Sequence, residues 1–124
     1  MSTFLAVAEI AIGAAYAAGA VFNTVYTLRH STEFYTTFAD RAWLRPPASL
    51  IRTVIIPNGT IFTVLLIAFQ VTIAIAIFTR GDLVTAALLA GGAFAFVVAF
   101  FSSPGGTVGN LTLAGIQFVL AAAR

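Results

Sequence analysis

The sequence has no cysteine and no lysine, and it contains one histidine, one methionine and one tryptophan among 124 residues. Without cysteine, the chain can form no disulfide, no thiolate metal site and no thiol redox centre. A single histidine excludes haem ligation by two histidines of the same chain. The basic residues are six arginines, and the net charge is only +2. That is too little for a nucleic-acid-binding surface, so no nucleic-acid partner is predicted.

Charged residues are scarce as a class. They make up 8% of the chain, 60% of the residues are hydrophobic, and the mean hydropathy is +1.04. Soluble domains carry about 25% charged residues, and a soluble monomer of this length could not bury so much apolar surface. The composition therefore predicts a single domain, residues 1–124, that is integral to a membrane. We expect it to be all-α, because helices satisfy their own backbone hydrogen bonds in lipid.

The longest uncharged run predicts a membrane span at about residues 58–79. It has no charged side chain from Gly59 to Phe78, and about 20 helical residues cover the ~30 Å hydrocarbon core of a bilayer. Pro57 precedes this run and must break or kink a helix. The span either starts with Asn58 as its cap or belongs to a longer helix, from about Ser49, that is kinked at Pro57.

The remaining apolar runs predict three further spans, at about residues 3–28, 82–101 and 110–123. Gly81 is the expected left-handed residue between the second and third spans, and Asp82 the expected cap of the third. Residues 102–109, SSPGGTVG, are interpreted as a turn because they are rich in helix breakers. Asn110 then caps a last helix of about 14 residues, ~21 Å, which is short for a crossing. The prediction is a four-helix membrane bundle.

The polar segment 29–57 is predicted to form the one sizeable loop. Aromatic and apolar residues at helical spacing indicate an amphipathic helix at residues 32–42, lying with Trp43 in the headgroup layer. Arg41, Arg45 and Arg52 are predicted to contact anionic lipid phosphates or an acidic partner. Since this segment carries four of the six arginines, the positive-inside rule favours a cytoplasmic loop and termini on the outer side.

Small residues recur at every fourth position in two spans. Such rows let neighbouring helices approach closely in lipid. The predicted packing residues are Ala11, Ala15 and Gly19 in the first span and Ala87, Gly91 and Ala95 in the third.

Five polar side chains within the spans are candidate ligand-binding residues: Glu9, Tyr16, Asn23, Gln70 and Gln117. Polar groups are costly in lipid unless they are paired, so they mark either a functional site or contacts between helices. One interpretation is a pocket for the head of a quinone or another small amphiphile. The other is structural hydrogen bonding between helices, with Glu9 at the membrane interface, where it faces water or neutralises an arginine. No second carboxylate lies in a span, so no catalytic acid–base pair is predicted. His30, the one histidine, is interpreted as a loop residue near the headgroups, so no metal site is predicted.

Several short motifs follow one another along the chain: Phe22-Asn23, FYTTFAD at 34–40, Pro57-Asn58, Phe69-Gln70, Arg80-Gly81, and Asn110 with Gln117. In this order they resemble the DoxX-like small membrane proteins, a broad bacterial family of four-helix proteins, over most of the chain. The resemblance implies a multi-pass protein of the bacterial inner membrane. Many members carry a glutamate near the position of Gln70, which implies that a role needing charge there is absent here.

Some DoxX-like members are linked to membrane oxidoreductase assemblies that act on sulfur compounds and quinones. Together with the small-residue rows and the absence of a complete catalytic set, the resemblance favours an accessory or anchor subunit of a larger respiratory or redox complex. Catalytic activity of the chain by itself is the less favoured interpretation. The expected partners are membrane lipids and other membrane subunits or further copies of the chain. No cofactor is predicted within the chain. The alternative is a bundle that binds a quinone, a lipid or another hydrophobic molecule. A transporter or channel is less favoured, because the sequence shows no inverted repeat.

Overall fold

The computed structural model describes residues 2–124, with side chains from residue 3 onward. The described residues form α-, π- and 3-10 helices and contain no strand, so the predicted all-α class is confirmed. The elements in chain order are α1 (Ser2–Phe22), η1 (Asn23–Thr27), α2 (Ser31–Arg41), α3 (Arg45–Leu50), η2 (Ile51–Ile55), η3 (Ile56–Asn58), α4 (Gly59–Phe78), α5 (Leu83–Ala99) and α6 (Pro104–Ala122).

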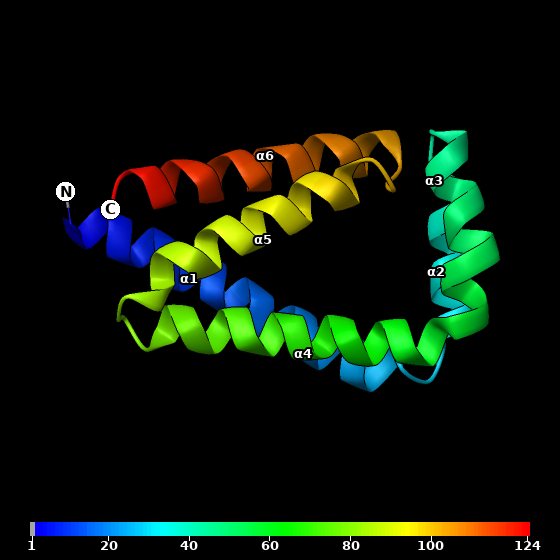
Figure 1. Ribbon diagram of the computed structural model, residues 1–124, viewed down its shortest axis with the longest axis horizontal. Helices are drawn as coiled ribbons and strands as arrows, with labels where there is room; N and C mark the ends of the chain where they lie inside the picture. Colours follow the sequence, from blue (N-terminus) through cyan, green and yellow to red (C-terminus); the bar gives the residue numbers. More distant parts are fainter. Residues whose placement is uncertain (1) are drawn as a thin grey trace.

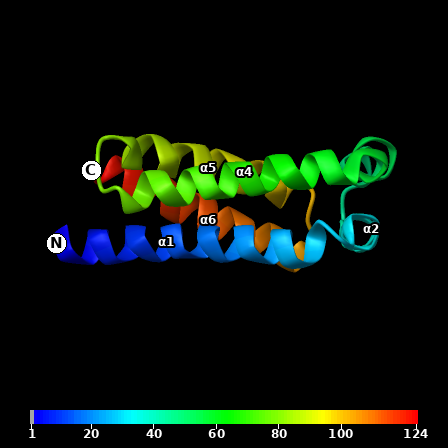
Figure 2. The same cartoon turned by 90° about the horizontal axis from the view of Figure 1, so that it is seen from below.

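The long helices α1, α4, α5 and α6 run roughly along the longest axis of the molecule (Figure 1). The shorter α2 and α3 lie across one end of them, and the two termini lie at the other end. Figure 2 shows the same arrangement from below, with α2 beyond the ends of α1 and α4. One end of the molecule is therefore closed by the polar segment, and the opposite end carries the termini and the α4–α5 turn.

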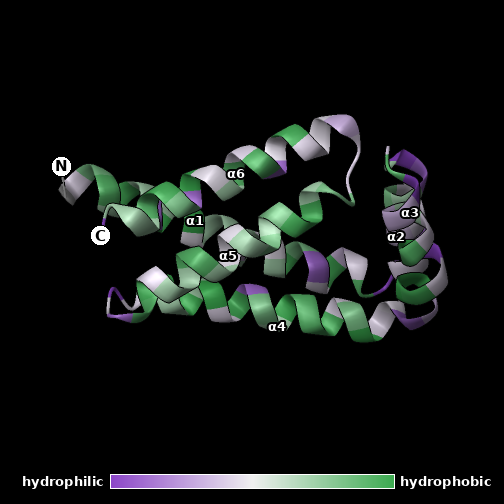
Figure 3. Cartoon of the chain, turned by 45° about the horizontal axis from the view of Figure 1, so that its top comes forward, coloured by the Kyte–Doolittle hydropathy of each residue, from purple (hydrophilic) through white to green (hydrophobic). Residues whose placement is uncertain are grey.

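Three helical segments within the described residues are long and apolar enough to cross a membrane: Thr3–Thr27, Arg45–Phe78 and Pro104–Ala122. Helix α5 is apolar as well, but its 17 residues extend only ~26 Å. Large apolar side chains on these helices face outward; Phe4 is 73% exposed and Val108 67%. Figure 3 shows hydrophobic residues along the long helices and more hydrophilic ones at α2, α3 and the α4–α5 turn.

The chain is helical from Arg45 to Phe78 but bends sharply at η3, where Pro57 lies. This favours the longer, kinked helix over one that starts at Asn58. The helix begins at Arg45, ahead of the predicted start near Ser49, because Pro46 and Pro47 occupy its first turn, where a missing N–H costs nothing. Asn58 does not cap α4 with its side chain; its Nδ2 donates to the carbonyl of Val54 at 2.9 Å.

The turn between α4 and α5 differs from the prediction in its left-handed residue. Arg80, not Gly81, has a positive φ of 58°, and no glycine of the described chain has one. Asp82 precedes α5 but makes no capping hydrogen bond with its side chain. A left-handed arginine is unfavourable by about 1–2 kcal/mol, and the ion pair of its side chain, described below, offsets this strain.

Helix α6 begins earlier than predicted and includes most of the segment interpreted as a turn. Ser103 is its N-cap and accepts a hydrogen bond from the amide of Gly106 at 3.2 Å, and Pro104 is the first helical residue. Serine followed by proline is a strong start signal for a helix. The glycines after it do not end the helix, and the 19 residues of α6 extend ~28 Å. Asn110 lies inside α6 and does not cap it; its Nδ2 donates to the carbonyl of Gly106 at 2.8 Å.

The predicted packing rows have different outcomes in the structure. Ala87, Gly91 and Ala95 are buried on α5, where α5 packs against α6. Ala11 and Ala15 are exposed, and Gly19 of the same row lies against the amide of Gln70. Helix α1 therefore buries a different face than its alanine row, because its polar residues need hydrogen-bond partners, which lie inside the molecule.

Candidate functional site

The inward face of α1 and η1 is a stripe of polar and apolar residues at helical spacing. Its buried members are Glu9, Ile12, Gly13, Tyr16, Ala20, Asn23 and Thr27. Three of the five predicted ligand residues belong to this stripe. The structure therefore brings them inside the molecule, and their partners decide what they can do.

Glu9 lies at the end of the molecule that carries the termini. It is 1% exposed, and its Oε1 accepts hydrogen bonds from Arg80 at 2.5 Å and from Arg124 at 2.8 Å. The other oxygen, Oε2, is buried and accepts no hydrogen bond from the described residues. One carboxylate thus joins α1 to the α4–α5 turn and to the end of α6. Of the two interfacial arrangements predicted for Glu9, the structure shows the pairing with arginine, here with two arginines, and not a carboxylate that faces water.

Tyr16 and Gln117 form the second contact. The Tyr16 hydroxyl donates to Oε1 of Gln117 at 3.0 Å, which links α1 to α6. Gly91 on α5 leaves room for this pair, since a Cβ at Gly91 would lie 2.6 Å from the Tyr16 hydroxyl. Gln117 is completely buried. The hydrogen bond satisfies two polar groups that would otherwise be unpaired in an apolar interior.

Asn23 and Gln70 form the third contact. Nδ2 of Asn23 donates to Oε1 of Gln70 at 2.8 Å, and the Thr27 hydroxyl donates to Oδ1 of Asn23 at 2.7 Å. Asn23 and Thr27 lie in the π-helix η1, a rare geometry that is frequent at functional sites. Gly19 also lies against Gln70, and a Cβ there would be 2.7 Å from Nε2. Gln70 therefore bonds a neighbouring helix.

The five residues do not converge on one pocket. They are divided among three contacts along α1, and no hydrogen bond joins one contact to the next among the described residues. Neither of the two cavities described below is lined by any of the five. This arrangement favours structural hydrogen bonding as the role of these side chains.

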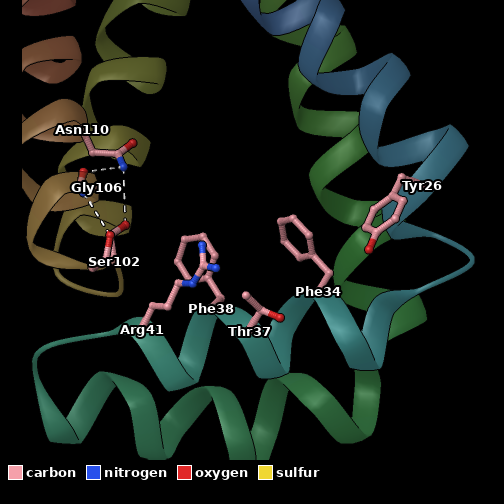
Figure 4. Close-up of a pocket in the computed structure, with 9 residues that line it drawn as sticks. Tyr26, Phe34, Thr37, Phe38, Arg41, Ser102, Gly106 and Asn110 are labelled. Atoms are coloured by element: carbon pink, nitrogen blue, oxygen red, sulfur yellow. Dashed lines mark hydrogen bonds between the residues drawn. The ribbon is translucent and has the colours of Figure 1, made fainter.

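A cavity of about 330 Å³ lies elsewhere, between α2 and the turn from α5 to α6. Its walls are formed by Tyr26, Phe34, Thr37, Phe38, Arg41, Ser102, Ser103, Gly106 and Asn110. Figure 4 shows Phe34, Thr37, Phe38 and Arg41 rising from one face of α2 into this space, with Arg41 on the side of Ser102 and Asn110. Tyr26 closes the other side. The cavity is thus polar at one end and aromatic at the other.

The remaining predicted lipid or partner contacts lie in the same end of the molecule. Trp43 is half exposed, and its indole N–H donates to the Thr107 hydroxyl at 2.8 Å, which fastens the loop to the start of α6. Arg52 forms an ion pair with Asp40 at 2.7 Å. Arg45 lines a second depression, of about 460 Å³, on another side of α2. Whether any of them contacts a lipid or another chain stays a prediction.

Tyr35 holds α2 against α4. Its hydroxyl lies 2.9 Å from that of Thr63, and because the Thr63 hydroxyl donates to the carbonyl of Gly59, Tyr35 is the donor. Burial raises the pKa of Tyr35 above its usual value, and the hydrogen bond with Thr63 opposes this shift. With Ala39 and Ile51 it forms a small hydrophobic cluster, separate from the main core. This cluster fixes α2 in place, and with it the cavity wall.

Several residues that make these side-chain contacts are not among the predicted site residues: Thr27, Tyr35, Thr63, Arg80, Ser102, Thr107 and Arg124. Thr27 follows Asn23 by four residues, so helical spacing carried a signal for that pair. The ion pairs of Glu9 join residues more than 70 positions apart, and nothing local in the sequence indicates them. The described residues contain no group of three histidine, aspartate or glutamate side chains that could hold a metal ion.

Comparison with known proteins gives no relative: no family model, no curated protein and no solved structure matches this chain.

Proposed function

We propose that this chain is a multi-pass membrane protein that serves as a non-catalytic accessory or anchor subunit of a larger membrane complex. The observation that carries this proposal is the internal pairing of the polar residues. Each of the five predicted ligand residues is bonded to another residue of the chain. The polar side chains of the interior therefore stabilise the fold, and the outward surface is available for contacts with other subunits.

The surface supports the same role. Three segments are long and apolar enough to cross a membrane, and the row Ala11 and Ala15 is exposed on α1. Small residues on an outward face allow a helix of another subunit to approach closely. A respiratory or redox complex of the bacterial inner membrane is the assembly that the DoxX-like resemblance suggests.

The second candidate function is binding of a quinone, lipid or other hydrophobic molecule. The pairing of Gln70 with Asn23 argues against a site in the bundle interior. The cavity between α2 and the α5–α6 turn favours a site at one end of the molecule instead. A transporter or channel has no specific support, because Glu9 is the one buried carboxylate on the long helices of the described chain, and no arginine or histidine is buried there.

Native purification in a mild detergent tests the subunit role. We expect the chain to elute with a larger membrane subunit at constant stoichiometry. Replacing Ala11 and Ala15 by leucine should disrupt this association, because two larger side chains would hold the partner helix away. Ala90→Leu, an exposed alanine on α5, is the matched control and should leave the association intact. A lone monomer, or equal association of both variants, would contradict the proposal.

A further inference from the structure

The cavity between α2 and the start of α6 has the chemistry of a site for an anionic amphiphile. We propose that it binds an anionic phospholipid, with the phosphate against Arg41 and the upper part of an acyl chain against the aromatic residues. This inference rests on the proposed membrane location but not on the proposed subunit role. The inference goes beyond the accessory function, because it assigns a ligand to a site that the interior residues do not form.

Charge is the first argument. Arg41 is the one charged side chain of the cavity wall, and no acidic residue lines it. Within residues 2–124, Arg41 makes no ion pair and no side-chain hydrogen bond, whereas Arg52, Arg80 and Arg124 are each paired with a carboxylate. The nearest acidic neighbour in sequence, Asp40, is held by Arg52 and lines the other depression instead. An anionic group is therefore the complementary ligand for this end of the cavity.

The neighbouring polar groups suit a phosphate. The Thr37 hydroxyl makes no hydrogen bond to the described chain, and the Ser103 hydroxyl accepts one from Gly106 but donates none. Both are free to donate to an oxygen beside Arg41. Asn110 is already occupied as a donor, to Gly106 and to Ser102. A guanidinium with adjacent hydroxyl donors is a common arrangement for phosphate oxygens, and charge-assisted hydrogen bonds of this kind are the stronger ones.

The aromatic end of the cavity suits an acyl chain. Phe34 and Phe38 lie one turn apart on α2, with ring centroids separated by 6.0 Å. The rings of Phe34 and Phe22 are in contact, with centroids 6.2 Å apart, and the ring of Phe22 stacks on that of Tyr26 at 5.4 Å. Phe22 is 50% exposed on the apolar surface of α1. A continuous aromatic path therefore leads from the cavity to the outer face of a membrane-length helix.

Size and position complete the argument. A volume of about 330 Å³ lies at the low end of ligand pockets, ~300–1,000 Å³, so it accommodates a headgroup and the first part of a chain but not a whole lipid. The cavity lies where α2 crosses the ends of the long helices (Figures 1 and 4). In a membrane-spanning chain this is the depth of the lipid phosphates, where an arginine beside aromatic rings is favoured.

The single tryptophan provides the test. Trp43 bonds to Thr107 and Ser102 at the edge of the cavity, and no other tryptophan contributes to the fluorescence. Phosphatidylglycerol with brominated acyl chains is titrated into the detergent-solubilised full-length protein, and brominated phosphatidylcholine is titrated in parallel. We expect Trp43 to be quenched at a lower mole fraction of phosphatidylglycerol. Arg41→Gln should weaken the preference for phosphatidylglycerol about tenfold, because it removes one charge-assisted hydrogen bond.

Arg29→Gln is the matched control. It removes the same charge from the same polar segment but does not line the cavity, so it should change the preference by less than about threefold, through the screened surface potential alone. Arg41→Lys keeps the charge and should keep most of the preference. The Arg41→Lys variant tests the proposal even if Arg41→Gln loses helicity in circular dichroism. If the lysine variant shows no preference for phosphatidylglycerol, the proposal is contradicted.

Three further outcomes would overturn the lipid site: equal quenching by the two lipids, equal effects of Arg41→Gln and Arg29→Gln, or displacement of the brominated lipid by excess inorganic phosphate. The last would identify free phosphate as the ligand. None of these results bears on co-purification with a larger subunit. Failure of the lipid site and failure of the subunit role are therefore distinguishable.

Discussion

Single polar residues decide how the apolar helices of this protein fit together. A carboxylate, two amides and several hydroxyls are buried, and nearly all of their polar atoms are paired. Glu9 is the most consequential of them, because its Oε1 holds two arginines from distant parts of the chain. The pair with Arg80 also explains a left-handed arginine directly before a glycine that could adopt that conformation more easily.

Glu9→Gln should destabilise the protein by about 3 kcal/mol, because it leaves two partly buried arginines without a counter-charge. Glu33→Gln is the matched control: Glu33 is 76% exposed and lies 4.0 Å from His30, so its loss should cost at most about 0.5 kcal/mol. The free energy of unfolding of both variants is measured by far-UV circular dichroism during unfolding in mixed micelles with a denaturing detergent. Equal stability of the two variants would show that the Glu9 contacts contribute nothing.

At the scale of elements, packing depends on where small residues lie. Helices α5 and α6 pack closely because glycines on α5 face large side chains of α6: a Cβ at Gly92 would lie 2.7 Å from the Phe118 ring. Gly91 similarly leaves space for Tyr16 and Gln117. Gly19 on α1 has the same role against Gln70 of α4, but not every glycine lies at a close contact. Gly115 on α6 has nothing within 4 Å of a built Cβ.

Gly91→Ala should therefore destabilise the protein by about 2 kcal/mol, since an added methyl forces the Tyr16–Gln117 pair apart. Gly115→Ala is the same substitution in an apolar helix with open space around it, and it should be neutral or stabilising by up to about 1 kcal/mol. Thermal unfolding of the two variants in one detergent gives the comparison. A Gly91 variant as stable as the wild type would show that α1, α5 and α6 do not meet as described.

At the scale of the whole molecule, charge is distributed unevenly between the two ends. The end with α2 and α3 carries Arg29, Arg41, Arg45 and Arg52, of which only Arg52 has an ion pair among the described residues. The opposite end carries Arg80 and Arg124, both bound to Glu9. The unpaired positive charge therefore lies at the loop end. The positive-inside rule places that end in the cytoplasm if the chain spans a membrane.

The absence of cysteine allows this topology to be tested without background labelling. Ser49→Cys places a thiol on the exposed surface of α3, and Gly81→Cys places one in the α4–α5 turn, where a side chain meets nothing within 4 Å. A membrane-impermeant maleimide added to intact cells should label only the Gly81→Cys variant. The same reagent added to inverted membrane vesicles should label only the Ser49→Cys variant. Labelling of both variants from one side would contradict a membrane-spanning arrangement.

The sequence alone determined the helical class and the approximate place of the long helices. An apolar chain with few charges has to satisfy its backbone groups internally, and helices do so whatever their neighbours are. Local signals were misleading where two mechanisms compete. The glycines after Ser103-Pro104 favour a turn, but the serine and proline before them start a helix. Gly81 was the expected left-handed residue, although Arg80 adopts that conformation while it binds Glu9.

Only the tertiary structure decided what the polar residues do. The sequence identified Glu9, Tyr16, Asn23, Gln70 and Gln117 as important, because polar groups within apolar helices must be paired or used. It does not indicate which helices face one another, so it leaves both a pocket and structural contact open. The fold pairs these residues along α1 and leaves Arg41 unpaired beside a cavity. Hydrogen bonds reach only ~3 Å, so the role of a buried polar side chain depends on its neighbours in space and not on its neighbours in sequence.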